Sequence, residues 1–113
     1  MLLLLSVLAL STPQGIDIGP QPSQLIESCK EVPLHNGLSQ NAQICMVFIA
    51  GIVDGQRYLA PDKFPYCFPP NNASIGQMAE AVVKFGEAHP EIDSSAALVT
   101  NALRARFPCR VKP

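Results

Sequence analysis

The sequence predicts a small all-α domain, a bundle of about four helices with two disulfides. Four segments repeat apolar residues at helical spacing, and no alternation long enough for a convincing strand occurs between them. Four cysteines, an even number, occur in the 113 residues. This length fits one compact domain, and an apolar content of 48 % with little net charge excludes a fully disordered chain.

The first predicted helix covers residues 24–32. Leu25, Ile26 and Cys29 share one face of it at helical spacing. Pro33 ends it, because proline disfavours helical backbone at the preceding residue and has no backbone N–H to donate.

The second predicted helix covers residues 40–60, with Ser39 as its N-cap. Ten successive residues, Ile44–Val53, are apolar, one glycine included. A helix that is apolar all round is typically buried, so we expect this one at the centre of the fold with nearly every side enclosed. Gly51 and Gly55 lie inside it and predict close packing against a neighbouring helix.

A proline-rich corner follows the second helix. The stretch Pro61–Pro70 holds four prolines, a density that neither a helix nor a paired central strand tolerates. Phe64, Tyr66 and Phe68 alternate with these prolines. We expect an irregular segment that is fixed by aromatic packing and by Cys67.

The third predicted helix follows Ser74 and ends before Pro90. Ser74 and Gln77 have the spacing of a capping box, in which the hydroxyl accepts from the third amide and the glutamine side chain bonds back to the cap. The last predicted helix begins at residue 93 or 94 and ends at Arg106, before a Phe-Pro-Cys segment.

The cysteines predict structural disulfides. Their spacings contain no Cys-x-x-Cys pair, which argues against a zinc knuckle or a thioredoxin-type site. Three connectivities are open, and free buried thiols are the alternative. The link between the first two helices is short, so these helices should lie antiparallel. That arrangement favours Cys29–Cys45 and leaves Cys67–Cys109 as the second pair.

The N-terminal residues predict export. Met1–Leu10 is an apolar run, too short to span a bilayer but typical of a secretory signal. We therefore expect a signal peptide over 1–11, a proline- and glycine-rich linker over 12–22, and the folded domain over 23–113, exported and without a membrane anchor after cleavage. The alternative is a buried N-terminal helix.

Several classes of function are excluded or disfavoured. A net charge of −1 gives no basic surplus for nucleic acid. His35 and His89 have no ligand or nucleophile spacing around them, so we expect no metal site, no cofactor and no catalysis. Asp54 follows the apolar run with Arg57 three residues on, which predicts a structural ion pair or simple exposure at a helix edge.

The link between the last two helices, residues 88–93, is the candidate binding segment. It holds His89, Glu91 and Asp93 around the stiff Pro90. A short loop on a cross-linked scaffold loses little entropy on binding, which suits insertion into a partner's cleft. A plain helix–helix connection is the alternative.

The chain resembles one family through three ordered segments. These are FIAGIVDGQ at Phe48–Gln56, YCFPPNNASIGQMAEAVVKFGEAHPE at Tyr66–Glu91, and ALRARFPC at Ala102–Cys109. In this order and spacing they look like the resistance-associated (Rap/Tai) immunity proteins of type VI secretion systems, over about residues 25–109.

The resemblance implies a small, all-helical, exported protein with disulfides, which often forms a homodimer. It implies a partner protein, a peptidoglycan-cleaving amidase effector, whose active site a projecting loop blocks. His89, Pro90, Glu91 and Asp93 would correspond to that loop. A small periplasmic helical chaperone, or a binding protein without an effector, is the alternative function.

Overall fold

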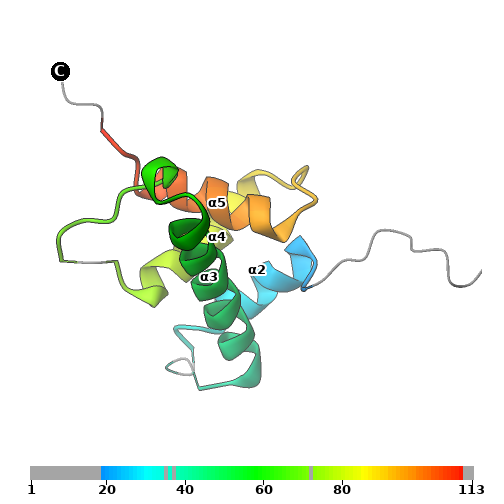
Figure 1. Cartoon of the computed structure of the whole chain (residues 1–113). Helices are drawn as coiled ribbons and strands as arrows, with labels where there is room; N and C mark the ends of the chain where they lie inside the picture. The colour runs from blue at the N-terminus through cyan, green and yellow to red at the C-terminus, as the bar shows by residue number, and fades with distance from the viewer. Residues whose placement is uncertain (1–18, 35, 37, 72, 111–113) are drawn as a thin grey trace, which may run out of the picture.

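The computed structural model describes residues 19–34, 36, 38–71 and 73–110. It contains four α-helices and one short 3-10 helix, and no strand occurs in these residues (Figure 1). The elements are α2 (Pro22–Lys30), α3 (Gln40–Leu59), η1 (Pro61–Lys63), α4 (Ile75–Ala88) and α5 (Ser95–Arg106). The predicted all-α class is confirmed. The predicted signal peptide and His35 lie outside the described residues.

Side-chain caps fix where the helices begin. Ser39 Oγ accepts from the Ala42 amide at 3.0 Å and starts α3. Ser74 Oγ accepts from the Gln77 amide at 3.1 Å, and Gln77 Oε1 accepts from the Ser74 amide at 3.0 Å. The predicted capping box is therefore confirmed. Helix α2 begins at Pro22, two residues before the predicted segment.

The helices pack in the spatial order α3, α2, α4, α5. Helix α2 contacts α3 on one side and α4 on the other, and α4 packs against α5. Figure 1 shows α2 beside α3, with α5 above them. The fully buried aliphatic side chains come from all four helices: Leu25, Ile49, Val82, Leu98, Val99 and Leu103.

Helix α3 is not enclosed on every side, which corrects the prediction of a central, all-round buried helix. Its buried face consists of Ala42, Cys45, Ile49 and Val53. On the opposite face Val47 is 71 % exposed. The α3 helix has 20 residues and α2, its main neighbour, has nine, so too few partners exist to cover both faces.

Gly51 and Gly55 do not pack closely against another helix, which corrects a second prediction. A methyl group built on either of them has no heavy atom within 4 Å. The close approach occurs at Gly86 of α4 instead. There an added methyl group would lie 2.6 Å from Cδ1 of Ile26 on α2, so only glycine fits without displacing that side chain.

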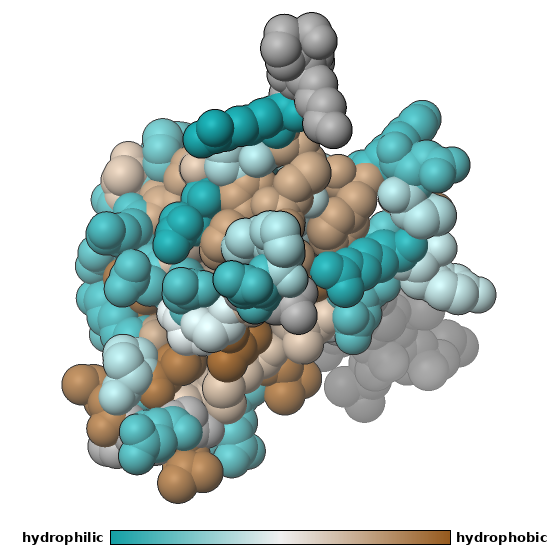
Figure 2. Space-filling view, turned by 90° about the vertical axis from the view of Figure 1, so that its left-hand side faces the viewer, coloured by the Kyte–Doolittle hydropathy of each residue, from teal (hydrophilic) through white to brown (hydrophobic). Residues whose placement is uncertain are grey.

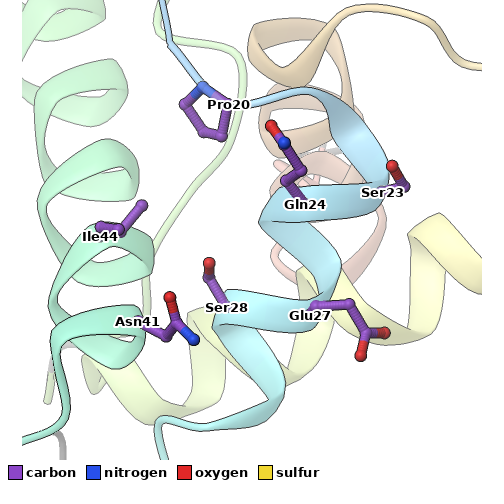
Figure 3. A pocket seen from close by; sticks show the side chains of 7 residues that line it. All are labelled: Pro20, Ser23, Gln24, Glu27, Ser28, Asn41 and Ile44. Carbon is purple, nitrogen blue, oxygen red and sulfur yellow. The ribbon is translucent and has the colours of Figure 1, made fainter.

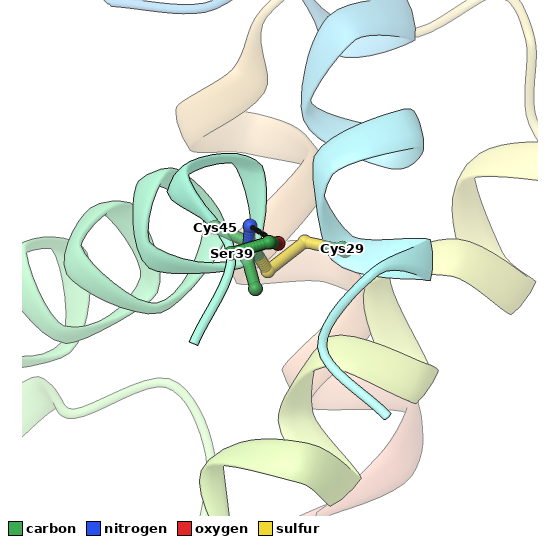
Figure 4. Close-up of a disulfide and its surroundings, with 4 residues drawn as sticks. Cys29, Ser39 and Cys45 are labelled. Atoms are coloured by element: carbon green, nitrogen blue, oxygen red, sulfur yellow. Dashed lines mark hydrogen bonds between the residues drawn. A yellow bond between two sulfur atoms is a disulfide. The ribbon is translucent and has the colours of Figure 1, made fainter. Parts of the chain in front are cut away.

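Both predicted disulfides are present. Cys29 and Cys45 join the last turn of α2 to the second turn of α3, with Cα atoms 5.0 Å apart. Figure 4 shows this bond beside the Ser39 cap. Cys67 and Cys109 join the proline-rich corner to the segment after α5, with Cα atoms 4.9 Å apart.

The proline-rich corner is fixed by aromatic packing, as predicted. Tyr66 is fully buried, and its ring centroid lies 4.5 Å from that of Phe64 and 5.3 Å from that of Phe68. Phe68 in turn packs edge-on against Phe107, which follows α5. The Cys67 amide donates to the Phe107 carbonyl at 2.8 Å, so a backbone hydrogen bond and the disulfide act at the same place.

Candidate partner-binding surface

The link between α4 and α5 is ordered by its own contacts. The Ile92 amide donates to the carbonyl of His89 at 3.2 Å and closes the turn. His89 stacks on Phe85 one helical turn earlier, with ring centroids 4.1 Å apart, and its Nδ1 lies 3.3 Å from Oε2 of Glu91. Figure 1 shows this link at one end of the bundle.

The predicted binding residues share this link but differ in exposure. Pro90, Glu91 and Asp93 are exposed, and His89 is half-buried. Ile92, which the sequence analysis did not single out, packs partly against the core and holds the link down. Pro90, Glu91 and Asp93 therefore lie on a link whose backbone is held by the contacts of His89 and Ile92.

A pocket lies beneath the link, between α2 and α4. We name it the α2–α4 pocket; its volume is about 260 Å³ and its lining includes Ser23, Ile26, Gly86, Glu87, His89 and Ile92. The sequence signal that could have found it is Gly86, an interior helix glycine next to the candidate link, where a missing side chain indicates a close approach.

One carboxylate, that of Glu87, lines the α2–α4 pocket. Oε2 of Glu87 lies 3.1 Å from Nζ of Lys30, which also lies 3.0 Å from Oε2 of Glu27. A hydrogen bond to Glu27, which is the larger cause, and one to Glu87 raise the pKa of Lys30. One ammonium is therefore shared between two carboxylates, while Glu91 and Asp93 add two more on the link.

A larger and more open hollow separates α2 from α3. Its volume is about 520 Å³, and Figure 3 shows the side chains that line it. Ser23, Gln24, Glu27 and Ser28 of α2 contribute to its lining, as do Asn41 and Ile44 of α3. Pro20 closes one side, and its carbonyl accepts from the Ser95 hydroxyl, which ties this segment to α5.

The outer face of α3 forms a second exposed surface. Apolar residues on it or beside it have large exposed fractions, among them Val47 at 71 % and Tyr58 at 86 %. The link before α3 adds the exposed Leu34 and Leu38. Figure 2 shows apolar side chains gathered on the lower part of the molecule, where Figure 1 places this link and the start of α3.

Asp54 forms no ion pair with Arg57 in the described part of the chain. Asp54 is exposed at the helix edge, which agrees with the second of the two predicted outcomes. The guanidinium of Arg57 lies instead over the rings of Phe64 and Phe68, 5.1 and 5.6 Å from their centroids. Arg57 therefore joins α3 to the corner through cation–π contacts.

A buried polar chain joins α3, the corner and α5. The Tyr66 hydroxyl donates to Oε1 of Gln56, whose Nε2 donates to Oγ1 of Thr100 at 2.8 Å. Burial raises the pKa of Tyr66 to about 12, although the positive charge of Arg57 opposes this shift. Each of the three side chains has a hydrogen-bond partner. These hydrogen bonds hold α3, the corner and α5 together, and no buried polar atom of the three is left unsatisfied.

The described residues contain no group of three or more His, Cys, Asp or Glu side chains placed to hold a metal ion. All four cysteines are in disulfides. None of the helices in the described ranges combines the length and hydropathy that crossing a membrane requires.

Comparison with known proteins gives one match. A family model described as Rap1a immunity proteins matches residues 22–109, which is most of the chain and all of the helical domain. No curated protein and no solved structure matches the chain significantly.

Proposed function

The chain belongs to the Rap1a immunity protein family, and on this premise we propose that it protects a cell by binding a peptidoglycan-cleaving amidase effector of a type VI secretion system. In this proposal the α4–α5 link enters the active-site cleft of the amidase and blocks it. The protein itself performs no catalysis and needs no cofactor.

The observation that carries the proposal is the ordered, exposed α4–α5 link. The stacking of His89 on Phe85 and the turn that Ile92 closes fix its backbone, while Glu91 and Asp93 stay exposed. A segment that is already ordered loses little conformational entropy when a partner binds it, so more of the contact energy remains as affinity.

The test uses a purified peptidoglycan-cleaving amidase effector of a type VI secretion system. We expect the wild-type protein to bind that amidase with a submicromolar Kd and to inhibit its hydrolysis of peptidoglycan. Replacing Glu91 and Asp93 together by alanine should weaken binding at least about tenfold, which corresponds to about 1.4 kcal/mol. Glu80→Ala, an exposed carboxylate elsewhere on α4, is the matched control and should leave the Kd unchanged. Absence of wild-type binding at micromolar concentration contradicts the proposal.

A periplasmic location is part of the proposal. Two disulfides support it, because such bonds form and persist in oxidising compartments. We propose that residues 1–11 act as the signal peptide and that 12–22 link it to the domain. Mass spectrometry of the periplasmic fraction should find a mature chain that begins at Thr12. Recovery of the full-length chain from the cytoplasm, with reduced thiols, would contradict this location.

A homodimer is also part of the proposal, and the exposed apolar face of α3 supports it. A second copy packed on this face would remove Val47 and Tyr58 from water. Sedimentation velocity should find a dimer for the wild type and a monomer for Val47→Glu. Glu80→Gln on α4 serves as the control for a change of charge alone. The concentration for this measurement is 100 µM, about a hundred times the micromolar range used for binding. If the wild type is a monomer at this concentration, the homodimer is rejected.

The same face of α3 favours a second candidate function, a small periplasmic chaperone. Exposed aliphatic side chains on a cross-linked scaffold can bind the apolar segments of unfolded clients. Suppression of client aggregation at acidic pH, lost in Val47→Glu, would favour this function. Amidase inhibition that survives Val47→Glu would favour immunity.

A further inference from the structure

The α2–α4 pocket has a shape that rigid parts of the fold determine. Ile26 of α2 faces Gly86 of α4 so closely that a methyl group on the glycine would lie 2.6 Å from Cδ1 of the isoleucine. Ile92 and Leu98 supply further hydrocarbon lining. The volume of about 260 Å³ is below the usual range for drug-sized ligands, about 300–1,000 Å³, so the pocket suits a single side chain.

The charge around this pocket is negative. Lys30 binds Oε2 of Glu87, and the structure gives Oε1 of Glu87 no partner among the described residues. Lys30 is the basic side chain that contacts Glu87, whereas Lys84 and Arg106 line a different groove and are not part of the α2–α4 pocket. A cation that approached the α2–α4 pocket would therefore meet an unshared carboxylate oxygen.

Hydrocarbon walls with a carboxylate at the mouth match one type of side chain. Arginine combines an apolar stem, which can lie along aliphatic surface, with a charged head that stays near water. Its planar guanidinium binds carboxylates through two hydrogen bonds, and arginine is common among residues that dominate protein interfaces.

We propose that the α2–α4 pocket receives an arginine side chain of the partner protein, with its stem against Ile26 and Ile92 and its guanidinium on Glu87. The partner would thus be bound at two places, at the exposed link and at the pocket beneath it. Only the identity of the protein that supplies the arginine rests on the proposed function; the pocket and its chemistry do not.

The test uses short peptides on the whole oxidised protein. Acetyl-Gly-Arg-Gly-amide should cause saturable NMR shifts of the Ser23, Gly86 and Ile92 amides, with a Kd on the order of millimolar, as expected for one side chain. The citrulline peptide has the same stem and shape without the charge, and it should bind at least about tenfold more weakly. Ser23→Trp, which fills the pocket from an exposed position, should abolish the shifts. Glu87→Gln should weaken binding, and Glu80→Gln should not.

Three results would overturn the proposal. They are no saturable shift with the arginine peptide, equal binding of the citrulline peptide, and shifts that persist in Ser23→Trp with an unchanged spectrum elsewhere. A separate titration with the amidase distinguishes this failure from failure of the proposed function. Amidase binding without peptide binding rejects the pocket alone, and peptide binding without amidase binding rejects the immunity function alone.

Discussion

Helices α3 and α4 are both rich in apolar residues and hold interior glycines, yet they pack differently. Helix α4 lies between α2 and α5, and its glycine at position 86 is buried against Ile26. Helix α3 lies at the edge of the bundle and turns Gly51 and Val47 toward solvent. The difference shows that apolar composition alone does not decide burial; the number of neighbouring helices does.

The anchoring of the two helices differs in the same way. Packing on both sides holds α4. Helix α3 is held on one face, and it relies more on specific ties: the Cys29–Cys45 bond near its start, and Gln56 and Arg57 near its end. We therefore expect α3 to be sensitive to the loss of single ties, and α4 to changes of volume.

The largest expected effect is the loss of the bond between α2 and α3. Replacing Cys29 and Cys45 together by serine should lower the free energy of unfolding by about 3 kcal/mol, because the closed loop no longer restrains the unfolded chain. Urea unfolding measures this loss, and amide hydrogen exchange should rise more in α3 than in α4. An unchanged urea midpoint would show that packing alone holds α3.

The next effect is a loss of stability in alkali. The pKa of Tyr66 is raised to about 12 in the folded protein and is about 10 in the unfolded chain, so the unfolded state loses this proton first. Stability is therefore complete below pH 10 and falls as the pH rises toward 12, by about 2–3 kcal/mol in all. Urea unfolding between pH 9 and 11.5 measures the slope.

Tyr66→Phe is the control for this pH dependence. It removes the titrating hydroxyl and keeps the ring between Phe64 and Phe68. Its unfolding free energy should change less with pH over the same interval, although it starts from a lower value because Oε1 of Gln56 loses the hydroxyl that donates to it. Parallel slopes for the two proteins would mean that Tyr66 is not the group responsible.

A smaller loss is expected where α4 meets α2. Gly86→Ala should cost about 2 kcal/mol, since overpacking in a core outweighs the better helix propensity of alanine. Ile26→Val removes Cδ1, the nearer of the two Ile26 carbons that the new methyl group would meet at less than 3 Å, so the double variant should recover part of the loss. A double-mutant cycle by urea unfolding measures this coupling. If the changes in unfolding free energy of the two single variants add up to that of the double variant, the close contact between Gly86 and Ile26 is refuted.

The smallest effect has the opposite sign and lies in α3. Gly51→Ala and Gly55→Ala should each raise the free energy of unfolding by about 0.5–1 kcal/mol, because the space above both residues is open and alanine favours the helix. Thermal unfolding at low micromolar concentration measures the change. Destabilisation would indicate that another surface covers this face of α3.

The features that could be predicted from the sequence are local. The Ser74–Gln77 cap depends on a spacing of three residues. The proline density of the corner forbids an α-helix or a paired central strand by itself, and the corner holds only the short 3-10 helix at Pro61–Lys63. The pairing of Cys29 with Cys45 followed from the short link between their helices, which limits where α3 can lie. These predictions needed no knowledge of distant contacts.

The features that were predicted wrongly or missed depend on residues far apart in sequence. Whether Gly51 packs depends on which helix reaches it, and none does in the described structure. Gly86 is a local sign of a close approach, but Ile26, which it meets, lies 60 positions away, so the sequence does not show where the α2–α4 pocket forms. The position of the link between the last two helices was predicted correctly. The stacking of His89 on Phe85 was missed, because it depends on the geometry at the end of α4.

Helix α5 determines how the protein can be attached for measurement. Its 12 residues span about 18 Å at 1.5 Å per residue, and they separate the link at its start from Cys109 after its end. The described chain leaves the domain at Arg110, away from the link (Figure 1). A fluorophore or chip anchor attached after Arg110 therefore leaves the opposite pole of the molecule, where the link lies, unobstructed.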